Sequence, residues 1–179
     1  MTPNDILLDR NRDFAEGFAH ADMPPLPRLG TLILTCIDAR VDPAHTLGLG
    51  LGDAVVFRNN GGRVTQAFID EVATLALMVA RMTDQPEAGL NIVLMQHTKC
   101  GAQSLADPAF RARILESIGV DVSESAITDP ESDLTTDIAR LRDAPGLPDG
   151  TNVSAMLYDV ETGQLRQIAP ARSLADLRG

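Results

Sequence analysis

Three short apolar runs, each followed by a polar segment, constrain the fold of this chain most strongly. Residues 31–35, 54–57 and 91–95 are rich in aliphatic and β-branched side chains, which is typical of buried strands. Helical spacing of apolar residues alternates with these runs, at about 65–82, 108–118 and 134–142, and a closing pair of strands is expected at 153–159 and 165–168. Strands that alternate with helices predict an α/β fold with a mainly parallel β-sheet flanked by helices.

The length and the prolines predict one domain with an N-terminal extension. A chain of 179 residues can bury one full core. Residues 1–28 are expected to form a helical arm and a linker, because Pro24, Pro25 and Pro27 interrupt any helix there. Residues 31–168 are expected to form the α/β core. We therefore predict a single domain over 1–179.

The chain is acidic, with a formal net charge of −10. Nucleic acids and anionic membranes attract clustered Lys and Arg, so this charge argues against both as partners. No run approaches the roughly 20 apolar residues that span a bilayer. The N-terminus also lacks the basic and then apolar pattern of a secretory signal. The sequence therefore predicts a cytoplasmic protein.

Both cysteines and one of the three histidines lie in two short segments, each directly after a strand-like run. The segments are 36–40 (Cys-Ile-Asp-Ala-Arg) and 97–100 (His-Thr-Lys-Cys). Because ligands bind beyond the carboxyl ends of parallel strands, these segments can meet in one crevice. Two thiolates and one imidazole favour zinc, and three protein ligands leave a fourth position open, as in catalytic sites. We predict that Cys36, His97 and Cys100 bind Zn²⁺.

Other interpretations of the two cysteines remain open. Isolated cysteines are often small core residues, and a pair can form a disulfide, although a reducing compartment disfavours one. A reactive redox thiol is also conceivable, but the chain has no Cys-x-x-Cys pair. A zinc ion with four protein ligands would make the chain a non-catalytic zinc-binding module.

Asp38 and Arg40 follow Cys36 at intervals of two residues. In extended backbone the three side chains project to the same side. Arg40 can then hold the carboxylate of Asp38 in a bidentate pair, which keeps it ionised and directs it at the open metal position. If Arg40 releases Asp38, the carboxylate is close enough to become the fourth ligand. We predict that Asp38 and Arg40 are the catalytic residues.

Residues 58–62 (Arg-Asn-Asn-Gly-Gly) lie between the second strand and a helix. The glycines tolerate positive φ, and backbone N–H groups ahead of a helix can hold an anion near the metal. A simple turn explains the segment equally well. We take Gly61 and Gly62 as candidate substrate-binding residues.

These segments, together with 158–163 (Tyr-Asp-Val-Glu-Thr-Gly), resemble those of the β-class carbonic anhydrases over about residues 31–168. The resemblance implies a β-carbonic anhydrase-like sheet in which both cysteines and His97 bind zinc. It implies reversible hydration of CO₂ to bicarbonate and a proton, by zinc-bound hydroxide that the Asp-Arg dyad orients. It also implies a homodimer or a larger assembly built from dimers.

Three residues depart from those frequent in the family, namely Ala39, Asn60 and Gln96. None removes a ligand or the dyad, but they leave the shape of the substrate pocket open. The compact chain also resembles carbonyl sulfide and carbon disulfide hydrolases, which share the zinc site. Both reactions add zinc hydroxide to a linear triatomic molecule, so COS or CS₂ remains an alternative substrate.

Overall fold

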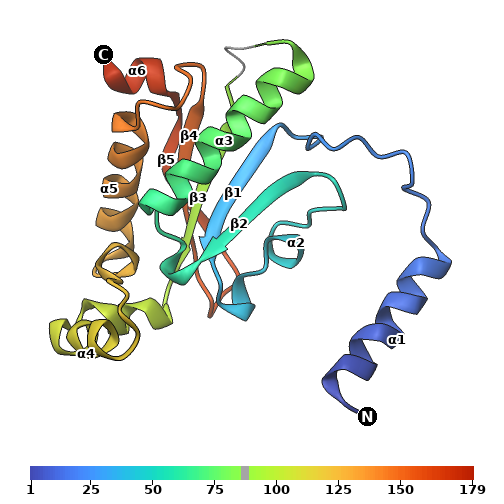
Figure 1. The fold of residues 1–179 in the computed structure, drawn as a ribbon, viewed down its shortest axis with the longest axis horizontal. Helices are drawn as coiled ribbons and strands as arrows, with labels where there is room; N and C mark the ends of the chain where they lie inside the picture. The colour runs from blue at the N-terminus through green and yellow to red at the C-terminus, as the bar shows by residue number, and fades with distance from the viewer. Residues whose placement is uncertain (86–88) are drawn as a thin grey trace.

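The fold is a five-stranded sheet with helices beside it (Figure 1). The computed structural model describes residues 1–85 and 89–179. The strand order is β2-β1-β3-β4-β5, with parallel pairing up to β4 and antiparallel pairing of β4 with β5. The strands are β1 (Thr31–Cys36), β2 (Ala54–Asn59), β3 (Asn91–His97), β4 (Asn152–Tyr158) and β5 (Leu165–Ser173). The predicted mainly parallel α/β sheet is confirmed.

The helices follow the predicted order, with two differences. The α-helices are α1 (Pro3–Glu16), α2 (Pro43–Thr46), α3 (Gln66–Thr83), α4 (Pro108–Ile118), α5 (Pro130–Asp143) and α6 (Leu174–Arg178). Helix α5 begins earlier than expected, because Asp129 caps it by accepting a hydrogen bond from the N–H of Ser132, and Pro130 suits its first turn. The short helices α2 and α6 were not expected, since four or five residues are too few to show a helical period.

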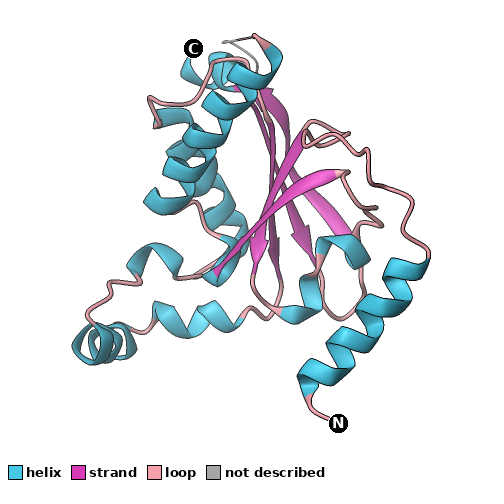
Figure 2. Ribbon diagram, turned by 45° about the vertical axis from the view of Figure 1, so that its right-hand side comes forward, coloured by secondary structure: helices cyan, strands magenta, loops and turns pink. Residues whose placement is uncertain are grey.

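The main hydrophobic core lies between the sheet and helices α3 and α5, which cover one of its faces (Figure 2). Phe68 of α3 is fully buried and contacts Phe57 of β2 edge to face, with ring centroids 5.1 Å apart. Leu134 and Leu141 of α5 are also fully buried. This packing fixes the strands, and with them the positions of the segments that follow their carboxyl ends.

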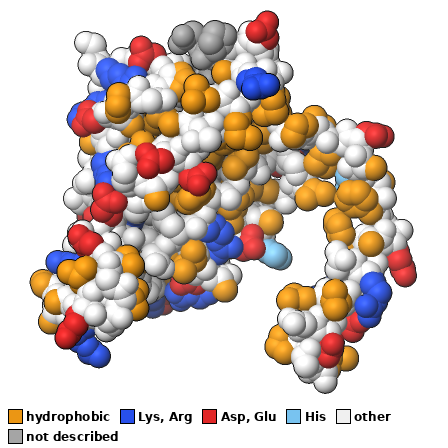
Figure 3. Space-filling model, viewed as in Figure 1, with side chains coloured by type: hydrophobic (Ala, Val, Ile, Leu, Met, Phe, Trp, Pro, Cys, Tyr) orange, Lys and Arg blue, Asp and Glu red, His pale blue; other side chains and the backbone are white. Residues whose placement is uncertain are grey.

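The N-terminal helix α1 lies away from the sheet (Figures 1 and 2). Its start is well defined, because the side chain of Thr2 and that of Asp5 each accept a hydrogen bond from the other's backbone N–H. None of its residues is buried, and hydrophobic side chains gather along it in the space-filling view (Figure 3). Throughout residues 1–85 and 89–179, the structure contains no helix with both the length and the hydrophobicity of a membrane span.

Candidate metal centre

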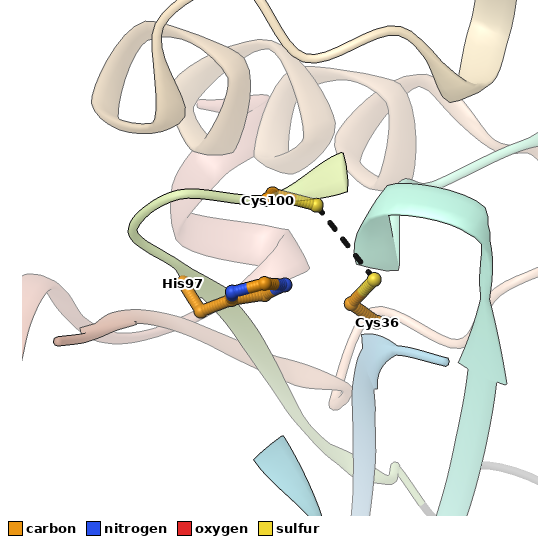
Figure 4. Close-up of side chains that lie close together, drawn as sticks. All are labelled: Cys36, His97 and Cys100. Carbon is orange, nitrogen blue, oxygen red and sulfur yellow. Dashed lines mark hydrogen bonds between the residues drawn. The ribbon is translucent and has the colours of Figure 1, made fainter. Parts of the chain in front are cut away.

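The sheet brings the two cysteine-containing segments together at its carboxyl edge (Figure 4). Cys36 is the last residue of β1 and His97 is the last residue of β3, the strand beside it. Cys100 follows one short turn later. The two sulfur atoms and a ring nitrogen of His97 all lie within 4.8 Å of one another, and all three residues are buried. The predicted convergence of these side chains is therefore present.

A strained turn returns the chain from His97 to Cys100. Lys99 has a φ of 52°, in the left-handed region that costs a non-glycine residue about 1–2 kcal/mol. Two hydrogen bonds hold this turn: Thr98 N–H donates to Tyr158 O over 2.9 Å, and Arg40 Nη2 donates to Lys99 O over 3.1 Å. The turn is thus fixed from both sides.

The loop between β4 and β5 supports the same turn. The hydroxyl of Thr98 accepts a hydrogen bond from Val160 N–H at 3.1 Å and donates to the carboxylate of Asp159 at 3.5 Å. The segment 158–163, which the sequence singled out only by resemblance, therefore acts as a brace for the residues between two candidate ligands.

The ring of His97 is oriented for ligation through Nε2. Its Nδ1 lies 2.9 Å from the carbonyl oxygen of Thr98, so an Nδ1–H donates there. In the described chain, Nε2 is buried and has no hydrogen-bond partner. A buried nitrogen lone pair without a partner is costly, and metal-ligating histidines commonly donate their other N–H in this way. His97 therefore presents a free lone pair to the two sulfur atoms.

The spacing of the sulfur atoms suits a shared metal ion. Cys36 Sγ and Cys100 Sγ lie 3.7 Å apart, and both cysteines are free. A disulfide needs about 2.05 Å. Two thiolates on one tetrahedral zinc, each about 2.3 Å from the ion, lie about 3.8 Å apart. Together with the lone pair of His97, this donor set fits a tetrahedral ion that prefers sulfur and nitrogen.

The two thiols compete for one proton. The thiol of Cys100 donates to Cys36 and lowers the pKa of Cys36 to about 4, against the effect of burial and with help from the N–H groups of Asp38 and Gly61. The thiolate of Cys36 and burial raise the pKa of Cys100 well above its usual value. A cation that takes the place of the shared proton would allow both sulfurs to ionise.

Asp38 and Arg40 form the expected bidentate pair beside the metal ligands. Arg40 Nε lies 3.0 Å from Oδ1 of Asp38, and Nη2 lies 2.6 Å from Oδ2. These charged hydrogen bonds hold the pKa of Asp38 well below its usual range. Oδ2 is 4.0 Å from Nε2 of His97, so the carboxylate borders the donor set.

The backbone that produces this pair differs from the expectation. The prediction of extended backbone at residues 36–40 is wrong, because Ala39–Val41 form a 3₁₀ turn that Asp38 caps. Asp38 accepts the backbone N–H of Arg40 at 2.9 Å as well as its side-chain N–H groups. The turn brings the two side chains together locally.

Arg58 is a residue of the site whose role the sequence did not reveal. Its Nε donates to Cys36 O over 3.0 Å and its Nη2 donates to Asp38 O over 2.7 Å. It thereby fixes the backbone on both sides of Ile37. The signal available in the sequence was a positive charge at the carboxyl end of a predicted strand. In the structure the next residue, Asn59, pairs with Cys36 across the two strands.

Gly61 and Gly62 have positive φ, as expected, but they face different neighbours. Gly61 lines the cavity described below, and an added Cβ there would lie 2.8 Å from Ser125 O. Gly62 packs on β1, where an added Cβ would lie 2.8 Å from Cys36 N. Binding of substrate by these glycines stays a prediction.

A cavity of about 330 Å³ opens beside Cys36 and Asp38. Asp38 and the sulfur-bearing Cys36 stand at its polar side, with Asn60 and Ser104. Its apolar lining consists of Ile37, Ala102, Leu105, Phe110 and Ile114. Such a cavity can hold a small apolar molecule close to the ionised carboxylate of Asp38.

Comparison with known proteins agrees with this site and fold. The carbonic anhydrase family model matches residues 31–119. Beta-carbonic anhydrase 1 of Mycobacterium tuberculosis is 31% identical over 172 residues, which cover 95% of this chain and 100% of that protein. A carbon disulfide hydrolase of Saccharolobus solfataricus is 30% identical over 163 residues, with 75% of each chain covered.

The solved structures place the chain in the same class. The crystal structure of carbonic anhydrase from Streptococcus mutans superposes with a TM-score of 0.74 and 32% sequence identity, over 94% of this chain and 98% of that chain. The fold and the Cys-His-Cys cluster thus define a protein of the carbonic anhydrase type. The chain belongs to the β-carbonic anhydrase family.

Replacing Gly62 with alanine should destabilise the fold at the metal centre. Its φ of 62° alone costs an alanine about 1–2 kcal/mol, and the overlap with Cys36 N adds to that. Gly101→Ala is the matched control, since no atom lies within 4 Å of its added Cβ. Chemical denaturation should show a loss of at least 1 kcal/mol for the first variant alone. Equal stability of both variants would contradict the close packing of Gly62 on β1.

Proposed function

We propose that this protein is a zinc-dependent carbonic anhydrase, which interconverts CO₂ and water with bicarbonate and a proton. One observation carries the proposal: three buried sulfur and nitrogen donors lie together, directly beside an ionised carboxylate and an apolar cavity. The family membership supports it independently.

Cys36, His97 and Cys100 would hold the zinc ion. When bound, zinc supplies a Lewis acid that makes a nucleophile from water near neutral pH. The protein contributes the placement of these donors: the sulfurs of the two cysteines are buried, and the tautomer of His97 is set by its hydrogen bond to Thr98. No protein nucleophile is required.

Asp38 would orient the reacting water. Its carboxylate is ionised and can only accept hydrogen bonds, so it selects the orientation in which an O–H group of the water points toward it and a lone pair points toward the cavity. Arg40 binds both carboxylate oxygens and keeps Asp38 from turning toward the donor set as a further ligand.

The apolar side of the cavity would bind CO₂. Carbon dioxide has no net charge, and its transfer from water to an apolar environment is favourable. The lining formed by Ile37, Leu105 and Phe110 provides such an environment. The same lining suits CS₂. Because a relative with 30% identity is a carbon disulfide hydrolase, hydrolysis of CS₂ or COS is the second candidate function.

The first test is a parallel assay of the zinc-loaded protein with CO₂, COS and CS₂. Stopped-flow detection should show CO₂ hydration far above the buffer rate at alkaline pH, with little release of hydrogen sulfide from the other two substrates. Hydrogen sulfide release without CO₂ hydration would favour the second candidate. Turnover of none of the three by fully loaded protein would contradict both.

The second test is the substitution Asp38→Asn. The amide cannot serve as a pure acceptor, so activity should fall by about 100-fold or more, the range typical of residues that handle a proton or its donor. Zinc content should remain at one ion per chain, measured by elemental analysis. Asp143→Asn is the control, because Asp143 forms a similar bidentate pair with Arg142 on the surface. Unchanged turnover of Asp38→Asn would refute the role of this carboxylate.

We also propose that the chain forms a homodimer, or a larger assembly built from dimers. Ile6, Leu7, Phe14 and Phe18 are exposed along the N-terminal arm, and the edge strand β2 leaves one side of the sheet unpaired within the described chain. A second copy could cover this apolar surface. The cytoplasmic location and the single domain over 1–179 stay predictions.

The double substitution Phe14→Asp and Phe18→Asp should dissociate the dimer. Two charges among the exposed apolar side chains of the N-terminal arm, one in α1 and one just past its end, oppose burial of the arm against another chain. Sedimentation should give twice the mass of one chain, or an even multiple of it, for the native protein and a lower mass for the variant. Asn11→Asp is the control on the exposed helix and should leave the dimer intact. A native protein of single-chain mass would contradict the assembly.

A further inference from the structure

A buried ion pair lies behind the metal centre, and the reaction proposed above does not use it. Arg63 is 6% exposed and Asp137 of α5 is fully buried. Arg63 Nε lies 2.8 Å from Oδ2 of Asp137, and Nη2 lies 3.1 Å from Oδ1. Arg63 Nη1 also donates to Ala126 O and lies 3.3 Å from Oδ1 of Asp133.

Stability alone does not account for this pair. Removing two charges from water costs several kcal/mol per ion, and apolar residues of similar volume often stabilise a protein as well or better. The pair therefore requires another explanation. The contacts of Arg63 and Asp137 suggest such an explanation, because they connect the pair to each of the three segments that carry a candidate metal ligand.

The first connection runs to Cys36. The side chain of Asn59 accepts the backbone N–H of Arg63 at 2.9 Å and donates to Arg63 O at 2.8 Å, which closes the turn between them. Within that turn, Gly62 abuts the backbone at Cys36, where an added Cβ would lie 2.8 Å from Cys36 N. Anchoring Arg63 thus fixes the turn against the first ligand.

The second connection runs to His97. Gln96 precedes it on β3, so the two side chains project to opposite faces of the sheet. Gln96 is buried, and its Nε2 lies 3.4 Å from Oδ2 of Asp137. The same carboxylate that holds Arg63 therefore also contacts the residue that precedes the second ligand.

The third connection runs to Cys100. Arg63 holds the carbonyl of Ala126, and the next residue, Ile127, donates its N–H to Ala102 O over 3.3 Å. Ala102 belongs to the 3₁₀ turn Gly101–Ala106, and Cys100 is the residue at which this turn begins. One guanidinium thus reaches the third ligand through two short backbone links.

We propose that Arg63 and Asp137 are positioning residues of the metal centre, which hold the segments of Cys36, His97 and Cys100 at the spacing that zinc requires. The inference rests on the proposed zinc function. Partners one layer behind metal ligands typically contribute 10–100-fold to metal affinity. The pair should therefore govern zinc affinity and the symmetry of the coordination, beyond any effect on folding.

The test is a double variant, Arg63→Met with Asp137→Leu, which removes both charges and leaves neither ion unpaired. Asp133 loses its contact with Arg63 in this variant, but it keeps the hydrogen bonds from the N–H groups of Thr128 and Asp129 and from the hydroxyl of Thr128. Zinc affinity, measured by competition with a chromophoric chelator, should fall about tenfold or more. The absorption spectrum of the Co²⁺-loaded variant should shift, while circular dichroism and the melting temperature show a folded protein.

The matched control is Arg142→Met with Asp143→Leu, an exposed bidentate pair on the same helix α5. It should leave both zinc affinity and the Co²⁺ spectrum unchanged. If the buried variant is folded and also shows native affinity and spectrum, the inference is wrong.

A single variant covers the case in which the double variant does not fold. Gln96→Leu removes an amide whose oxygen is already without a partner in the described chain, so the fold should persist. It should weaken zinc binding several-fold and shift the Co²⁺ spectrum, and native values would again overturn the inference. Failure of the native protein to bind zinc would instead overturn the proposed function.

Discussion

The burial of two thiols and an unpartnered imidazole nitrogen in one place is the constraint on which the rest of this structure depends. Polar groups in a protein interior need partners, and here Nε2 of His97 has none within the described chain. The sulfurs of Cys36 and Cys100 share one proton where a cation could sit between them. The parallel strands, the strained turn at Lys99 and the Asp38–Arg40 pair all serve to keep these donors together and accessible from one side.

The convergence of the ligands could be predicted because it follows from topology. The apolar runs at 31–35 and 91–95 predict parallel strands, and parallel strands end at the same edge of a sheet, so Cys36 and His97 could be expected in one crevice. The structure adds that these two strands are direct neighbours. Their chemistry then pointed to a metal. The bidentate contact of Asp38 with Arg40 was also expected, although the extended backbone from which it was predicted is wrong. The contact forms all the same, because the long side chain of arginine can reach a residue two positions away from a 3₁₀ turn as well as from extended chain.

Contacts between residues far apart in sequence could not be predicted from these patterns. Arg63 and Asp137 are 74 positions apart, and charged residues are normally exposed, so nothing local indicates that both are buried together. The sequence pattern placed Arg58 in a turn. Its role was not visible there, because the two carbonyl groups that it binds belong to the end of a different strand. The glycine at 62 signalled a special backbone, but its close approach to β1 depends on how the whole sheet packs. The choice of substrate could not be predicted from these patterns either, since CO₂ and CS₂ would bind against the same cavity wall.

The main core of the protein contains none of the three candidate metal ligands. It is built from Phe68, Leu34, Leu94 and their neighbours between the sheet and helices α3 and α5, whereas Cys36 and Cys100 belong to a separate, smaller cluster. A zinc finger collapses without its ion because the ion replaces a core. In this chain the main core does not include the candidate metal donors. We therefore expect the protein to fold without the ion and to take up metal in a separate binding step.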